Sequence, residues 1–160
     1  MLNETAPTRD HAWIAAHIPH AGRMCLLDRV VAWDASYVLC SADSHRRPDH
    51  PLRQFDRLGA ACGIEYAAQA MAVHGALQAG TDAARIAVPG MLVSMRGVTL
   101  HVTRLDDVDE TLQVRAQRLG SSEDLLLYSF SVSAGARLLL DGRASVKLDS
   151  APTPSAGTPA

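Results

Sequence analysis

The longest uncharged part of the chain is an apolar run, and its pattern predicts a helix. Residues 58–77 are small and apolar except for Glu65, Gln69 and His74. A helix that is apolar on every side is expected to be buried. The run is about as long as a membrane span, but its alanines, glycines and polar residues suit lipid poorly. We therefore expect one long buried helix here and no membrane span.

Most of the remaining pattern indicates β-strands. Short apolar segments rich in β-branched and aromatic residues alternate with turn residues, both before and after the helix. The expected strands cover residues 24–33, 36–43, 90–103, 110–118, 125–134 and 137–148, with turns at Asp34-Ala35, Asp106-Asp107, Gly120-Ser121 and Gly135.

The order of these elements predicts an α+β fold. A short helix at residues 10–17, which ends before Pro19, comes first. Two strands, one long helix and four further antiparallel strands follow. The long helix must bury its apolar surface, so we expect it to pack against the concave face of the sheet. Asp56 is placed to help its N-terminal end.

Composition indicates one domain. The 160 residues, 48% of them hydrophobic, are enough for a single core, which we place in residues 1–149 together with the short N-terminal helix. Residues 150–160 are small, uncharged and rich in proline, so a disordered tail is expected there. The net charge of −2 gives no electrostatic reason to expect nucleic acid as a partner.

The cysteines and the N-terminus indicate a cytoplasmic protein. Cys25, Cys40 and Cys62 are widely spaced and form no CxxC pair, so we expect reduced, buried thiols. The first residues are polar and of mixed charge, without the apolar core of a signal peptide.

Glu65 is the first candidate for chemistry. Burial disfavours the ionised form of a carboxylate, and a carboxyl group that keeps its proton can act as a general acid. Gln69 lies one helical turn further on, where its amide could orient the carboxyl group. The alternative is a structural glutamate that pairs with an arginine of a neighbouring element.

A general acid needs a base, and two of the seven histidines lie in suitable loops. His20 precedes the first strand and His50 precedes the long helix, although either could be an ordinary exposed loop residue. The spacing of His45, Asp49 and His50 matches no established set of metal ligands, so we expect no metal. The chain also lacks a phosphate loop, a dinucleotide fingerprint and a nucleophile elbow, and we expect no cofactor.

Three segments resemble a known family. Residues 18–30, IPHAGRMCLLDRV, resemble the opening of bacterial 3-hydroxyacyl-ACP dehydratases of the hotdog superfamily. Residues 63–72, GIEYAAQAMA, resemble the central-helix motif of these enzymes, and residues 91–102 resemble the next strand. The similarity extends in order over residues 10–148. It is closest to the divergent branch found with aryl-polyene and related polyketide-like biosynthesis.

This resemblance implies a hotdog fold that dimerises with its sites at the subunit interface. In such enzymes a histidine removes the α-proton of a 3-hydroxyacyl thioester, and an acidic residue protonates the departing hydroxyl. Glu65 matches the acidic position. Typical members carry the histidine in a G-H-F-P-G segment, whereas here His50 lacks the flanking glycines. His20 fits the P-H motif of the divergent branch, so both histidines stay candidates.

The implied activity is dehydration of 3-hydroxyacyl thioesters on acyl carrier protein to 2-enoyl thioesters, in fatty-acid-like or aryl-polyene biosynthesis. We expect Gln69, Met24 and Ser94 to contact the substrate. The implied assembly is a homodimer, or a heterodimer with a related hotdog subunit. Two alternatives remain: a hotdog thioesterase in which Glu65 activates water, and a non-catalytic hotdog subunit of a heteromeric dehydratase.

Overall fold

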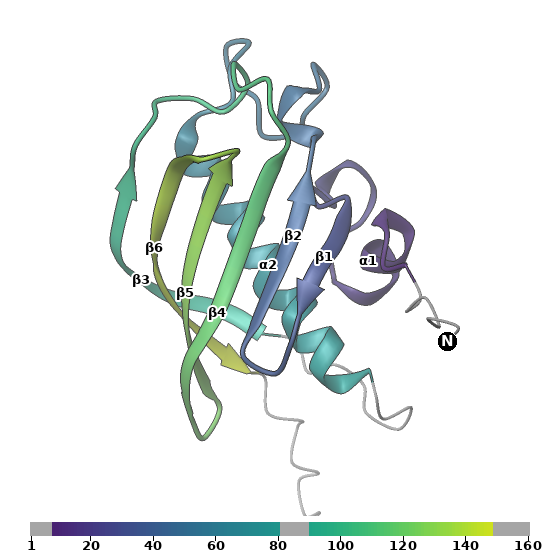
Figure 1. Ribbon diagram of the computed structural model, residues 1–160, viewed down its shortest axis with the longest axis vertical. Helices are drawn as coiled ribbons and strands as arrows, with labels where there is room; N and C mark the ends of the chain where they lie inside the picture. Colours follow the sequence, from purple (N-terminus) through teal and green to yellow (C-terminus); the bar gives the residue numbers. More distant parts are fainter. Residues whose placement is uncertain (1–7, 81–89, 149–160) are drawn as a thin grey trace, which may run out of the picture.

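An antiparallel sheet curves around one long helix (Figure 1). The computed structural model describes residues 8–80 and 90–148. Its six strands lie in the order β1-β2-β4-β5-β6-β3. The elements are α1 (His11–His17), β1 (Arg29–Trp33), β2 (Tyr37–Ala42), α2 (Gly63–Ala79), β3 (Gly90–Leu100), β4 (Leu112–Ser122), β5 (Leu125–Ala134) and β6 (Arg137–Leu148). This arrangement confirms the predicted α+β hotdog fold.

The core lies between α2 and the inner face of the sheet. Helix α2 contacts β2, β4 and β5. Residues of β4 alternate between buried and exposed, with Leu112, Val114 and Ala116 directed inward. This period of two is what a strand with one buried face requires. The exposed positions of the sheet carry both polar side chains and some apolar ones, such as Val93 and Leu138.

The start of α2 lies very close to β6. A Cβ added at Gly63 would lie 2.5 Å from Cδ2 of Leu140, so only glycine allows this approach without movement of the leucine. The close approach fixes the first turn of α2, which carries Glu65, against the sheet.

The apolar segment expected as the first strand is only partly a strand. Strand β1 begins at Arg29, and Gly22–Met24 form a 3₁₀ turn instead. Cys25, Leu26 and Leu27 are buried in irregular backbone that packs on the core. Their apolar character therefore reflects burial and not strand pairing. Over so short a run, a buried strand and buried irregular backbone have the same sequence pattern.

Two other strand ends differ from the prediction. Strand β4 continues to Ser122 through an irregularity between Arg118 and Gly120, so the expected turn at Gly120-Ser121 is wrong. The chain turns instead at Glu123, whose φ is 51°. Strand β3 ends at Leu100, three residues earlier than expected.

Asp56 does not help the start of the long helix. It lies in the preceding loop with a φ of 59°. The N–H of Leu58 bonds to the carboxylate of Asp106 at 2.9 Å, and a 3₁₀ turn at Ala60–Cys62 leads into α2. The carboxylate of Asp106 thus holds the segment before this turn, and α2 has no side-chain cap at its start.

The three cysteines are free thiols, of which Cys25 and Cys40 are buried and Cys62 is partly exposed. Burial raises the pKa of the Cys40 thiol to about 12, so it stays protonated and unreactive. Within the described residues, no helix is long and apolar enough to cross a membrane. The tail expected at residues 150–160 lies outside the described residues.

Candidate active site

An elongated cavity of about 640 Å³ lies between α2 and the sheet. Small residues of α2, namely Ala68, Ala72 and Gly75, form one wall, and Leu126 and Val146 contribute to the other. The cavity is mainly apolar, with a few polar groups gathered at one end, as is typical of small-molecule sites.

The polar end of the cavity contains His20 and Glu65. Nε2 of His20 lies 3.0 Å from Oε1 of Glu65, and both residues line the cavity. His20 comes from the loop after α1, and Glu65 comes from the first turn of α2. The structure thus brings together two residues that are 45 positions apart and were expected to act as base and acid.

Glu65 is not buried as the apolar run suggested. Its side chain is 34% exposed, and that of His20 is 26% exposed. The helix is buried on most of its surface, but Glu65 lies where α2 borders the cavity. Among residues 8–80 and 90–148, its ion-pair partner is His20 and not an arginine, so the alternative of a structural Arg–Glu pair is not what the fold contains.

The second nitrogen of His20 is free. Nδ1 is buried and has no hydrogen-bond partner within the described part of the chain. A carbonyl or carboxylate at this position would fix which nitrogen carries the proton. Within the described residues, the polar contact of the His20 ring is therefore the one with Glu65.

His50 is held in a different, buried environment. Its Nδ1 accepts a hydrogen bond from the N–H of Leu52 at 3.1 Å, so the proton is on Nε2, which donates to the hydroxyl of Tyr66 at 3.1 Å. Tyr66 and Ser44 share a hydrogen bond of 2.7 Å, and Ser44 donates to the carbonyl of Leu26. Each side chain in this series of hydrogen bonds has a partner.

The environment of His50 favours the neutral imidazole. Burial lowers its pKa, and the nearby positive charges of Arg53 and Arg47 lower it further. His50 does not line the cavity that contains Glu65. The structure therefore does not bring these two residues together.

Gln69 contacts the backbone and not Glu65. The side chain is fully buried, its Nε2 donates to the carbonyl of Met24 at 2.6 Å, and its Oε1 accepts from the N–H of Leu26 at 2.9 Å. Both ends of the amide are thus occupied, which corrects the expectation that it orients the carboxyl group. Gln69 instead fastens the loop after His20 to α2.

The other two residues expected to contact substrate also lie away from this cavity. The carbonyl of Met24 is bound by Gln69, and its side chain is not part of the lining. Ser94 is exposed on β3 and borders a smaller hollow that it shares with Arg96 and Arg143. None of the three expected substrate contacts lines the cavity.

Tyr128 is a cavity residue that the sequence did not single out. Its hydroxyl donates to Nδ1 of His74 at 2.8 Å, because Nε2 of that buried imidazole donates to the carbonyl of Asp34. With its hydroxyl engaged, Tyr128 gives the cavity an apolar ring. Burial lowers the pKa of His74, which keeps this pair neutral. The alternation along β5, which places Tyr128 on the inner face of the sheet, is the sequence signal that could have identified it.

The side chains considered for a metal site face separate partners. His45 donates from Nε2 to the carbonyl of Val108 at 2.9 Å, while Asp49 pairs with Arg47. His50 bonds to Tyr66 as described above. Within residues 8–80 and 90–148, no group of three or more His, Cys, Asp or Glu side chains could hold a metal ion.

Comparisons with solved structures identify the same fold. The chain is similar to a structure of the dehydratase heterocomplex ApeI:P from Xenorhabdus doucetiae, with a TM-score of 0.75 and 22% identity over 86% of this chain and 91% of that one. A thioesterase from Haemophilus influenzae matches with a TM-score of 0.56 and 10% identity, over 79% of this chain and 81% of its own. AziG from S. sahachiroi matches with a TM-score of 0.53 and 17% identity, over 78% of this chain and 91% of its own.

A comparison with curated protein sequences gives no significant match. The family models give a clear result. The model for ApeP-like proteins, described as ApeP dehydratase, matches residues 12–153. This match covers nearly all of the described structure, including the loop with His20, the whole of α2 and all six strands. The chain therefore belongs to the ApeP-like dehydratase family.

Proposed function

We propose that this protein dehydrates 3-hydroxyacyl thioesters to 2-enoyl thioesters, with His20 as the base and Glu65 as the acid. The observation that carries the proposal is the 3.0 Å contact between His20 Nε2 and Glu65 Oε1 at the polar end of an apolar cavity. Membership of a dehydratase family supports the same reaction class.

The chemistry requires only these two groups and a polarised carbonyl. The thioester makes its α-hydrogen acidic, and an imidazole nitrogen in hydrogen-bond reach can remove it. The β-hydroxyl is a poor leaving group, so a carboxyl group must give it a proton as the C–O bond breaks. A substrate placed beside the His20–Glu65 pair would meet both groups. The proton taken from carbon is balanced by the one given to the departing water.

The shape of the cavity supports an elongated apolar acyl group. Its walls run along α2 from Glu65 to Gly75, which is ten residues or about 15 Å of helix. No atom lies within 4 Å of a Cβ built at Gly75, so this position is open space within the cavity wall. An acyl chain with its thioester at Glu65 would extend towards Gly75, and we propose acyl carrier protein as the carrier of that thioester.

Gly75→Leu is expected to shorten the usable cavity. Its side chain would occupy space that a long acyl chain needs. If about three methylenes lose their burial, each worth about 0.8 kcal/mol, kcat/KM for long substrates falls by about 60-fold. Short substrates should keep their rate within about twofold. The measurement is kcat/KM for a series of 3-hydroxyacyl thioesters of increasing length.

Ala79→Leu is the matched control, because Ala79 lies on the same helix outside the cavity lining. Equal losses for short and long substrates in Gly75→Leu would show that the acyl chain does not run along this wall.

The free edge of β3 supports pairing with a second hotdog subunit. Strand β3 pairs with β6 on one side and is the last strand of the sheet. Met91, Val93 and Met95 on it are 62%, 48% and 43% exposed. A long apolar edge is a liability that proteins usually cover. The heterocomplex of the similar dehydratase shows one way in which such a fold is assembled.

Light scattering tests this assembly. We expect a mass of about twice the 17.1 kDa of the chain, or a one-to-one complex with a related hotdog protein. Val93→Lys should weaken the assembly by placing a charge at the edge, whereas Leu119→Lys, also at an exposed position but on β4, should not. A fully active, monodisperse monomer at micromolar concentration would contradict the proposal.

The reaction itself is tested with the purified protein. A 3-hydroxyacyl group on acyl carrier protein should be converted to the 2-enoyl thioester, with the thioester bond intact. Release of free thiol without enoyl product would identify the thioesterase that the same fold can support. No turnover by the protein alone, with turnover restored by a hotdog partner that carries its own acid and base, would identify a non-catalytic subunit.

A further inference from the structure

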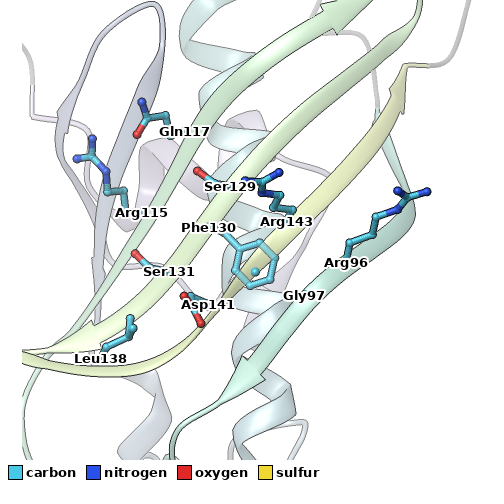
Figure 2. Close-up of a pocket in the computed structure, with 11 residues that line it drawn as sticks. Arg96, Gly97, Arg115, Gln117, Ser129, Phe130, Ser131, Leu138, Asp141 and Arg143 are labelled. Carbon is cyan, nitrogen blue, oxygen red and sulfur yellow. The ribbon is translucent and has the colours of Figure 1, made fainter.

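A second hollow, of about 610 Å³, lies on the outer face of the sheet. Figure 2 shows its side chains projecting from four strands, with α2 on the far side of the sheet. It contains Arg96 of β3, Arg115 of β4 and Arg143 of β6. It shares no lining residue with the cavity that contains His20 and Glu65.

The strand register places these arginines in two adjacent rows. Arg96 is the direct cross-strand partner of Arg143, and Arg143 is the partner of Ser129. The next row begins at Arg115, the partner of Ser131. Side chains directly opposite one another on antiparallel strands share a face and lie close together. The register therefore combines three guanidinium groups, two hydroxyls and the carboxylate of Asp141, the partner of Ser131, on one surface. The guanidinium group of Arg115 also lies over the ring of Tyr37.

Positive charge is in excess in this hollow, where three arginines and one acid, Asp141, form part of the lining. None of the three arginines forms an ion pair within residues 8–80 and 90–148. Asp141, the acid in the lining, lies 3.2 Å from His101. Like charges directly opposite on a sheet are destabilising, so the pair of Arg96 and Arg143 costs the folded protein free energy. An anion bound between them would remove that cost.

The floor of the hollow is apolar. A Cβ added at Gly142 would lie 2.9 Å from Cζ of Phe130 and 2.9 Å from Cγ2 of Val98, so the ring of Phe130 packs directly beneath Gly142 and stays buried at 4% exposed. The pairing of β3 with β6 is irregular between Arg96 and Thr99, where Gly97 has a φ of 59°. This irregularity lies next to Arg96 in the lining of the hollow.

We propose that this hollow binds a small phosphate ester. Guanidinium groups match the geometry of phosphate oxygens and keep their charge at every physiological pH. A phosphate ester carries up to two charges and several acceptor oxygens, which suits three arginines and two hydroxyls better than a single carboxylate does. Its organic part would lie over Leu138, which is 39% exposed, and the volume is in the range of small-molecule sites. The inference does not depend on the dehydratase activity.

Isothermal titration calorimetry of the full chain tests the proposal with ADP, inorganic pyrophosphate, adenosine and citrate. We expect ADP and pyrophosphate to bind at low ionic strength, and adenosine and citrate to bind at least tenfold more weakly. Arg143→Gln should weaken ADP binding at least tenfold. Arg137→Gln, the matched control on the same strand outside the hollow, should leave it unchanged.

Thermal unfolding gives an independent readout of the same site. Without ligand, Arg143→Gln should be as stable as the wild type or more stable, because it removes the positive charge directly opposite Arg96. ADP should raise the Tm of the wild type but not that of the variant. The proposal is overturned if no phosphate compound binds at millimolar concentration, if citrate binds as well as ADP, or if Arg143→Gln binds ADP like the wild type.

Discussion

Replacing Glu65 by Gln is expected to slow dehydration by about two to four orders of magnitude while the protein stays folded. Glutamine keeps the size of the side chain and can still contact Nε2 of His20, but it cannot give a proton to the departing hydroxyl. Glu65 is one-third exposed at the cavity wall, so the amide should cost little stability. The measurement is kcat and kcat/KM for a 3-hydroxyacyl thioester, with circular dichroism as the check on folding.

Glu123→Gln provides the matched control, because Glu123 is exposed in the turn between β4 and β5. It should keep the activity of the wild type. If Glu65→Gln were folded and equally active, Glu65 would not be the general acid, and the proposed mechanism would be wrong.

Alanine substitutions at His20 and His50 are expected to have opposite effects on rate and stability. His20→Ala removes the proposed base and should lower kcat/KM by about two to four orders of magnitude at little cost in stability. His50→Ala breaks the buried chain through Tyr66 and Ser44 and should lower the free energy of unfolding by about 1–3 kcal/mol. Its activity, measured well below its Tm, should stay within severalfold of the wild type.

The pair of variants separates catalysis from packing, because each is the control for the other. A folded His50→Ala variant that loses its activity, together with an active His20→Ala variant, would assign the base to His50. If both variants stay active, neither histidine is the base.

The elements that follow one clear periodicity could be predicted from the sequence. Residues 125–134 and 137–148 match β5 and β6 to the residue. Most of β5 alternates as a half-buried strand does, and the turn at Gly135 separates it from the apolar start of β6. The long helix follows from its uncharged run. The candidate pair of His20 and Glu65 also came from the sequence, through an isolated carboxylate and a family motif.

The partners of side chains could not be predicted in the same way. Residues 25–27 are as apolar as a strand, and only the folded chain shows that they pack in irregular backbone. The pattern places Gln69 on the face of Glu65 but does not show that its amide is satisfied elsewhere. The wall formed by Leu126, Tyr128 and Val146 depends on which strands lie next to α2, and this is a property of the sheet order.

The amide of Gln69 also determines how firmly the proposed acid and base are held together. His20 lies on a loop, and the two hydrogen bonds from Gln69 to Met24 and Leu26 attach the end of that loop one helical turn from Glu65. The separation of the two groups is therefore set before substrate arrives, and binding need not supply the entropy of ordering the loop. A carboxylate at position 69 could not donate to the carbonyl of Met24, so the loop would open locally while the sheet stayed folded.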